Sequence, residues 1–100
     1  MYTLNMTFKV EHDIYPEWKK WMDAEFIPAF LSLEDIAHTQ LHQLMGHDDE
    51  QGTTMVLQVG FRTEGELRRY LDNFQSEFHR KVSDLWGEKA VFFQTVMKQI

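Results

Sequence analysis

Two histidines are the first residues whose type and spacing could do chemistry. His38 and His42 carry imidazole groups of the kind that bind Zn²⁺. On a helix a spacing of four residues would bring both rings to one ion, but along a strand it separates them by ~13 Å. The surrounding residues predict a strand, so we interpret both as ordinary half-exposed histidines. A metal site shared across a dimer axis is the alternative that this spacing leaves open.

A short acidic stretch lies between two predicted strands and contains His47, Asp48, Asp49 and Glu50. Carboxylate oxygens suit a hard cation, but a calcium loop spaces its ligands regularly around a glycine, and this stretch does not. Turn-forming residues flank it on both sides, so it is typical of a solvated hairpin turn. We therefore predict no metal site and no cofactor from these motifs.

Other chemistries find no support in the sequence. The absence of cysteine excludes thiolate metal sites, disulfides and cysteine nucleophiles. No phosphate loop or nucleophile motif is present around Ser32, Ser76 or Ser83. A formal net charge of -6 argues against a nucleic-acid partner. Because no stretch approaches the ~20 apolar residues of a membrane span and the first residues lack a secretion signal, we expect no membrane partner and a cytoplasmic location.

Four strands are predicted along the chain. Strict alternation of apolar and polar residues predicts strands over residues 2–10 and 53–61. A weaker pattern predicts further strands over residues 36–45 and 89–97. The register of the strand over 36–45 stays open, because a slip of one residue would move both histidines and Gln40 to the opposite face of the sheet.

Two amphipathic helices are predicted between these strands. The first starts at a cap on Asp13 and ends near residues 31–33. The second starts at a capping box formed by Thr63 and Glu66, ends at Gly87 and is expected to break around residues 72–76. Residues 1–100 therefore predict a single α+β domain with the ferredoxin-like βαββαβ fold, in which two helices cover one face of a four-stranded antiparallel sheet.

The uncovered face of this sheet is the most informative part of the prediction. A sheet face in water usually carries many charges, whereas this one is expected to carry neutral amides and hydroxyls together with Val and Phe. We expect the same face of a second copy to cover it, which gives a homodimeric α/β barrel. The residues expected on this face are Thr3, Asn5, Thr7, Thr54, Val56, Gln58, Phe92, Gln94 and Val96.

A cavity between the two sheets would present hydrogen-bonding groups to a small ligand. Four of the face residues are candidates to bind it: Asn5, Thr7, Gln58 and Gln94. Buried amides need partners, and these can be each other, water or a ligand. A self-satisfied or water-filled dimer interface is therefore the alternative to a ligand site.

Several short motifs resemble one bacterial family. They are Asn5-Met6-Thr7, Trp18-Lys19-Lys20-Trp21-Met22, Ile27-Pro28, Gly52-Thr53 with Gln58, and Phe93-Gln94-Thr95. Their order and spacing are similar to those of domain of unknown function 4286. The resemblance implies the ferredoxin-like, dimeric α/β-barrel fold and implies no activity. Phe26 stands where relatives are expected to carry His, and Gln94 stands where they are expected to carry Arg.

Two functions from different classes remain. The first is a non-enzymatic module that binds a small ligand or a protein partner through the inter-sheet cavity or a helix surface. The alternative is a small dimeric-barrel monooxygenase acting on haem or a quinone-type substrate, with Asn5 and His79 as its polar participants and Tyr70 or Trp86 nearby. This alternative is an analogy at the level of the fold. It requires His79 to point into a closed pocket beside Asn5.

Overall fold

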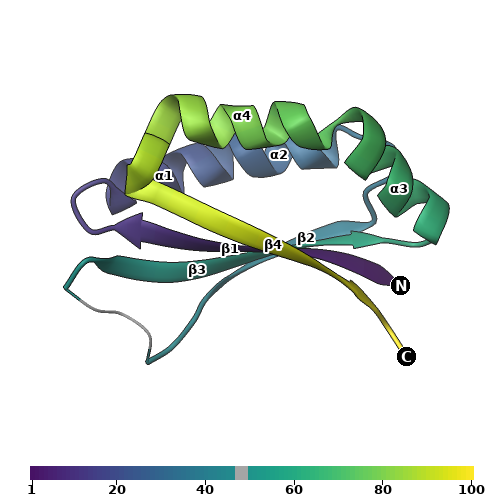
Figure 1. Cartoon of the computed structure of the whole chain (residues 1–100), viewed down its shortest axis with the longest axis horizontal. Coiled ribbons are helices and arrows are strands. Elements are labelled where there is room, and N and C mark those ends of the chain that lie inside the picture. The colour runs from purple at the N-terminus through teal and green to yellow at the C-terminus, as the bar shows by residue number, and fades with distance from the viewer. Residues whose placement is uncertain (47–49) are drawn as a thin grey trace.

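The chain folds around one antiparallel sheet. The structure, a computed structural model, describes residues 1–46 and 50–100, so most of the acidic stretch between the second and third strands lies outside the described residues. The strands β1 (Tyr2–Glu11), β2 (His38–Gln43), β3 (Gly52–Phe61) and β4 (Ala90–Lys98) pair in the order β2-β3-β1-β4. The helices lie on one side of this sheet (Figure 1). The predicted ferredoxin-like fold is therefore confirmed.

The first helical segment is divided where a continuous helix was expected. It consists of α1 (Tyr15–Trp21), a π-helical turn η1 (Met22–Phe26) and α2 (Ile27–Leu31). The Ile27 N–H donates to the carbonyl of Met22, five residues back. Pro28 follows directly and has no N–H of its own, so the backbone widens just before it.

The expected cap on Asp13 is not formed. Ile14 occupies the N-cap position of α1 and makes no side-chain capping bond. The Asp13 carboxylate instead accepts a hydrogen bond from Lys89 Nζ at 2.8 Å. That hydrogen bond holds the pKa of Asp13 below its usual value.

The second helical segment follows the prediction closely. It comprises α3 (Glu64–Asn73) and α4 (Gln75–Trp86), divided at Phe74, and is followed by a 3-10 turn η2 (Gly87–Lys89). The Thr63 hydroxyl accepts the N–H of Glu66 at 3.1 Å, as the capping box requires. Gly87 ends the segment with a φ of 55°, a conformation that favours glycine.

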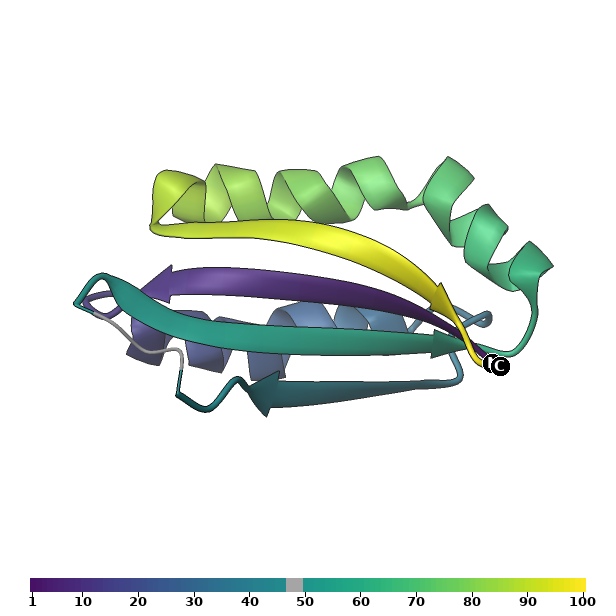
Figure 2. The same ribbon diagram turned by 60° about the horizontal axis from the view of Figure 1, so that its bottom comes forward.

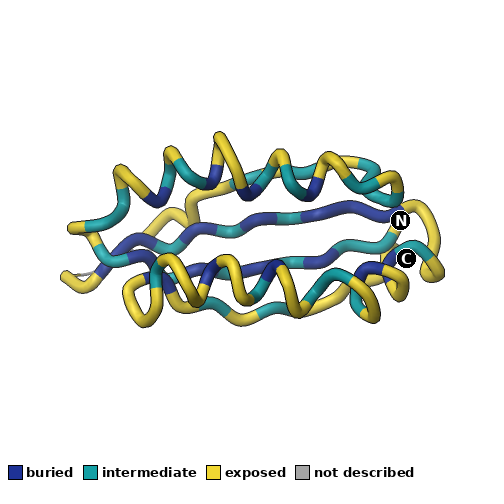
Figure 3. The backbone as a smooth tube through the Cα atoms, turned by 90° about the horizontal axis from the view of Figure 1, so that it is seen from above, coloured by how far each residue is buried: buried dark blue, intermediate teal, exposed yellow. Residues whose placement is uncertain are grey.

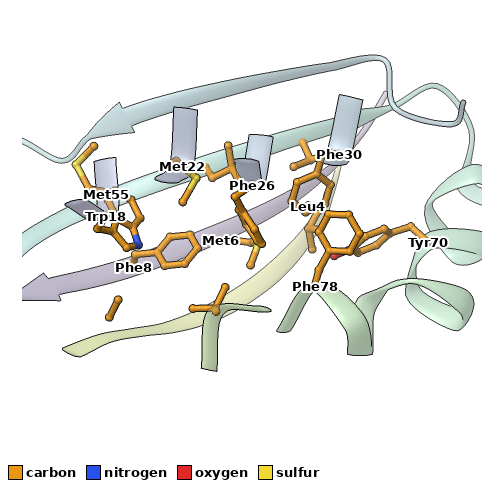
Figure 4. Close-up of a cluster of buried hydrophobic side chains, with 14 of the residues drawn as sticks. Leu4, Met6, Phe8, Trp18, Met22, Phe26, Phe30, Met55, Tyr70 and Phe78 are labelled. Atoms are coloured by element: carbon orange, nitrogen blue, oxygen red, sulfur yellow. The ribbon is translucent and has the colours of Figure 1, made fainter. Parts of the chain in front are cut away.

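An aromatic core fills the space between the sheet and the helices. Alternate residues of β1 and β3 point into it, so buried and less buried positions alternate along these strands (Figure 3). Phe30 of α2 lies against Phe26, Tyr70 and Phe78, with ring centroids 4.3–5.5 Å apart. Figure 4 shows these rings side by side between the helices and β1. Rings in such edge-on and tilted contacts stabilise the core beyond the area that they bury.

The predicted face of β4 is wrong. Gln94 pairs directly with Met6, and Phe92 pairs directly with Phe8, while Val96 pairs with Leu4. Directly paired residues point to the same side of a sheet, and these β1 partners are fully buried under the helices. Gln94, Phe92 and Val96 therefore lie on the helix side, and Val91, Phe93, Thr95 and Met97 lie on the open side. Apolar residues occupy both sides of this strand, so the sequence pattern did not determine which side is covered.

Candidate functional site

Neutral polar side chains form a row across the open face of the sheet. Asn5 of β1 pairs directly with Gln58 of β3 and with Thr95 of β4, and Gln58 pairs with Gln40 of β2. Figure 2 shows these four strands side by side. Because paired residues share a face, the four side chains lie at one level of the sheet. We call this set, Gln40, Gln58, Asn5 and Thr95, the amide row.

Hydrogen bonds connect the middle of the amide row to Thr7. Gln58 Nε2 donates to Asn5 Oδ1 at 3.2 Å, and Asn5 Nδ2 donates to Thr7 Oγ1 at 3.2 Å. These bonds all run in one direction, so the Thr7 oxygen acts as an acceptor and its hydroxyl hydrogen is left to donate elsewhere. The structure therefore brings three of the four predicted ligand-binding residues together.

A hollow of about 280 Å³ adjoins Thr7 on this face. The residues that line it are Thr7, Phe8, Lys9, Thr54, Val91, Phe92 and Phe93. The side chains of Phe8 and Phe92 lie on the helix side of the sheet, so Val91 and Phe93 supply the apolar side chains of the open side. Phe93 is 64% exposed and Val91 is 51% exposed, so both present apolar surface at the rim. We call this feature the sheet hollow. The sequence pattern does not reveal it, because the predicted orientation of β4 places Phe93 and Val91 on the helix side.

The structure also settles the register of β2. Gln40 pairs with Gln58 and His42 pairs with Val56, so His38, Gln40 and His42 all lie on the open face. A Cβ built on Gly60 would lie 2.2 Å from Cε1 of His38. Gly60 thus leaves the space that the His38 ring occupies at this edge of the sheet.

The fourth predicted ligand-binding residue belongs to a different polar group. Gln94 lies under α4, where its Oε1 is 2.9 Å from Nε2 of His79, and its amide nitrogen donates to Gln75 Oε1. The His79 ring also packs edge-on against Phe92, with centroids 4.9 Å apart. Gln94 is thus separated from Asn5 by the sheet itself.

The same geometry separates the two residues of the monooxygenase hypothesis. His79 lies on the helix side, whereas Asn5 lies on the open side, so one chain does not bring them together. The Nε2 atom of His79 is already engaged by Gln94. Tyr70 is packed among Phe30, Phe61 and Phe78, and Trp86 packs edge-on against Trp21. Neither aromatic residue lies on the face that carries Asn5.

Tyr70 supplies a prediction about stability. Its hydroxyl is buried and has no hydrogen-bond partner within the described residues, and burial raises the pKa of Tyr70. A tyrosine in the unfolded chain ionises at about pH 10. Above that pH the unfolded state loses a proton that the folded state keeps. The unfolding free energy therefore falls as the pH rises above this value. Tyr70→Phe is expected to add about 1 kcal/mol at pH 7 and to reduce the alkaline loss.

Urea unfolding at pH 7 and at pH 10.5, with wild type and variant at one protein concentration, measures both effects. A Tyr70→Phe variant that unfolds more easily than wild type at pH 7 would contradict the unpaired hydroxyl.

The described residues contain no group of three or more His, Asp or Glu side chains that could hold a metal ion. In residues 1–46 and 50–100, no helix is both long and apolar enough to cross a membrane.

Comparison with known proteins places the chain in a family. The sequence profile of a domain of unknown function, DUF4286, matches residues 1–100. The chain belongs to the DUF4286 family. The resemblance seen in the sequence motifs is thereby confirmed. A search of curated proteins found no match for this DUF4286 chain.

Solved structures share the fold of this DUF4286 domain at very low sequence identity. An ethd-family protein from Bacillus halodurans is 6% identical, with a TM-score of 0.75 and full coverage of both chains. HapK from Hahella chejuensis is 12% identical, with a TM-score of 0.70, and the match covers 100% of this chain and 93% of HapK. SnoaB, a cofactor-independent oxygenase from Streptomyces nogalater, is 11% identical, with a TM-score of 0.62, and the match covers 98% of this chain and 92% of SnoaB. Such distant similarity establishes the shared fold and leaves function to the site itself.

Proposed function

We propose that this DUF4286 domain is a homodimeric, non-enzymatic binding module whose two open sheet faces pack against each other and enclose a small-ligand site. The observation that carries the proposal is the composition of this face. Its middle is the uncharged amide row, and its β4 side carries exposed Phe93, Val91 and Met97. Aromatic residues and Met are enriched in protein interfaces, and charged residues are depleted there.

A second copy is the occupant that best fits this face. A twofold dimer places the same patch against itself, so exposed apolar side chains of one chain meet those of the other. Two sheets stacked face to face lie ~10 Å apart, which leaves side chains to fill the space between them. This arrangement would cover Phe93 and Met97 and would leave the amide row to satisfy its remaining hydrogen bonds inside the interface.

Binding is favoured over catalysis by the groups that the face offers. The amide row and Thr7 hold and orient a ligand through neutral hydrogen bonds, and none of these groups takes up or releases a proton near neutral pH. The titratable side chains of β2, His38 and His42, lie at the edge strand, two strands away from Thr7. The site thus supports recognition of a ligand better than proton transfer to it.

Solution mass by light scattering tests the assembly. The chain has a mass of 12.0 kDa, so a dimer has twice that mass. At micromolar concentration we expect the dimer value at both low and high salt, because the contact is mainly uncharged. A mass of one chain would contradict the proposal. An absorption titration with haem tests the non-enzymatic part, and a Soret band that disappears in His79→Ala would contradict that part alone.

A further inference from the structure

We infer that the sheet hollow binds a small planar aromatic carboxylate, with the carboxylate on Lys9 and Thr7 and the ring against Phe93 and Val91. This inference rests on the proposed binding function and names the class of its ligand.

The size and lining of the hollow fit a flat ring. Its volume of about 280 Å³ is roughly nine times the ~30 Å³ that one water occupies in the liquid. Phe93 and Val91 line it from β4 with exposed apolar surface. An aromatic ring placed there gains offset or edge-on contact with the Phe93 ring. The sheet of a second copy would close the open side and remove the ligand from water.

Each of the polar side chains of the hollow can donate a hydrogen bond. The Thr7 oxygen accepts from Asn5 Nδ2, so its hydroxyl hydrogen is available to a ligand. Thr54 adds a second hydroxyl, and Lys9 adds an ammonium group, which donates and never accepts. A ligand oxygen that only accepts, such as a carboxylate oxygen, complements this set.

Charge favours an anionic ligand at this point of an otherwise acidic chain. Among the described residues that line the hollow, Lys9 is the cation and none is a carboxylate. The carboxylates of Glu11, Asp13, Glu50 and Glu88 line a different hollow, which Lys9 also borders. An ammonium carries three N–H donors, so Lys9 can hold a carboxylate while it keeps the contact that it makes within the chain. Hydrogen bonds between an ammonium and a carboxylate are about twice as strong as neutral ones, so the charge is expected to dominate selectivity.

The probe pair for the test is 2-naphthoate and its neutral isostere 2-naphthamide, titrated into ¹⁵N-labelled protein. We expect naphthoate to shift the amide signals of Thr7, Lys9, Thr54 and Phe93 and to bind roughly tenfold more tightly than naphthamide. Lys9→Met should abolish this tenfold preference, and Thr7→Val should weaken naphthoate binding roughly fivefold. Lys20→Met is the matched control, because it removes the same charge from an exposed position on α1 and should retain the preference.

Two results would overturn the inference: equal affinity for both probes, or naphthoate shifts confined to the groove of Trp21, Glu25, Phe26 and Lys81 on the helix side. The mass of the same sample separates the two proposals. A dimer without Lys9-dependent binding would contradict the ligand class alone, whereas a monomer would contradict the homodimer, whichever probe it binds.

Discussion

A Phe93→Asp variant is expected to be monomeric while it keeps the native fold. Phe93 is 64% exposed in the single chain, so its loss leaves the core intact. In the proposed dimer it lies within the interface, on the β4 side of the open face. Truncating such an anchor costs ~2 kcal/mol or more of binding free energy. Each chain of a twofold dimer contributes one Phe93, so this cost occurs twice. The dimer dissociation constant should therefore rise about a thousandfold. Sedimentation equilibrium, combined with far-UV circular dichroism, measures both the mass and the fold.

Leu85→Asp is the control for this experiment. Leu85 lies on α4, on the other side of the sheet, and is 54% exposed. Its replacement introduces the same charge on a comparable apolar side chain and should leave the mass of a dimer unchanged. If Leu85→Asp dissociates the dimer and Phe93→Asp does not, the chains associate through the helix layer.

A Phe30→Ala variant is expected to lose about 3–5 kcal/mol of unfolding free energy, because the cavity left by a buried Phe is not refilled by its neighbours. Phe30 is fully buried and contacts the rings of Phe26, Tyr70 and Phe78, which come from the two helical segments. The substitution removes the contacts of Phe30 with Tyr70 and Phe78, which join these segments. Urea denaturation at one fixed protein concentration measures it, since dimer dissociation contributes to apparent stability.

The adjacent residue supplies the control. Leu31 is 54% exposed, and Leu31→Ala is expected to change the unfolding free energy by no more than about 0.5 kcal/mol. A loss for Phe30→Ala as small as the one expected for Leu31→Ala would contradict the place of Phe30 in the core.

The sheet and helix order could be predicted because one face of β1 and β3 is buried and the other is not. Leu4, Met6 and Phe8 alternate with Thr and Asn, and every one of these apolar residues is fully buried. A period of two then defines both the strand and its core side. The same logic failed on β4, where Phe92 and Phe93 are both large and apolar. There the direct pairing of Phe8 with Phe92 decides the side, and pairing is a long-range property.

The hydrophobic period also could not predict the π-helical turn. Trp18, Met22 and Phe26 are all buried, which is compatible with a regular helix. The residue that indicates an irregular turn is Pro28. It lacks the N–H that a regular helix uses, so a preceding carbonyl is left without its helical donor. A proline within the predicted helix could have indicated the irregular turn, but not its type.

The candidate site was predicted in part. Asn5, Thr7 and Gln58 follow from the polar side of β1 and β3, and the structure joins them by hydrogen bonds. Gln94 was misplaced with the rest of β4, and the sheet hollow could not be found without Phe93 on the open face. Which residues form a concave surface depends on three strands being in register, and a single sequence does not contain that information.

The central claim, that two open faces pack together, is tested most directly by isotope-filtered NOE spectroscopy on a dimer of one ¹³C-labelled and one unlabelled chain. We predict intermolecular NOEs between the Phe93 ring and side chains of the open face, such as Val56 and Met97. Intermolecular NOEs from Leu85 or Leu31 on the helix side, with none from Phe93, would contradict the claim.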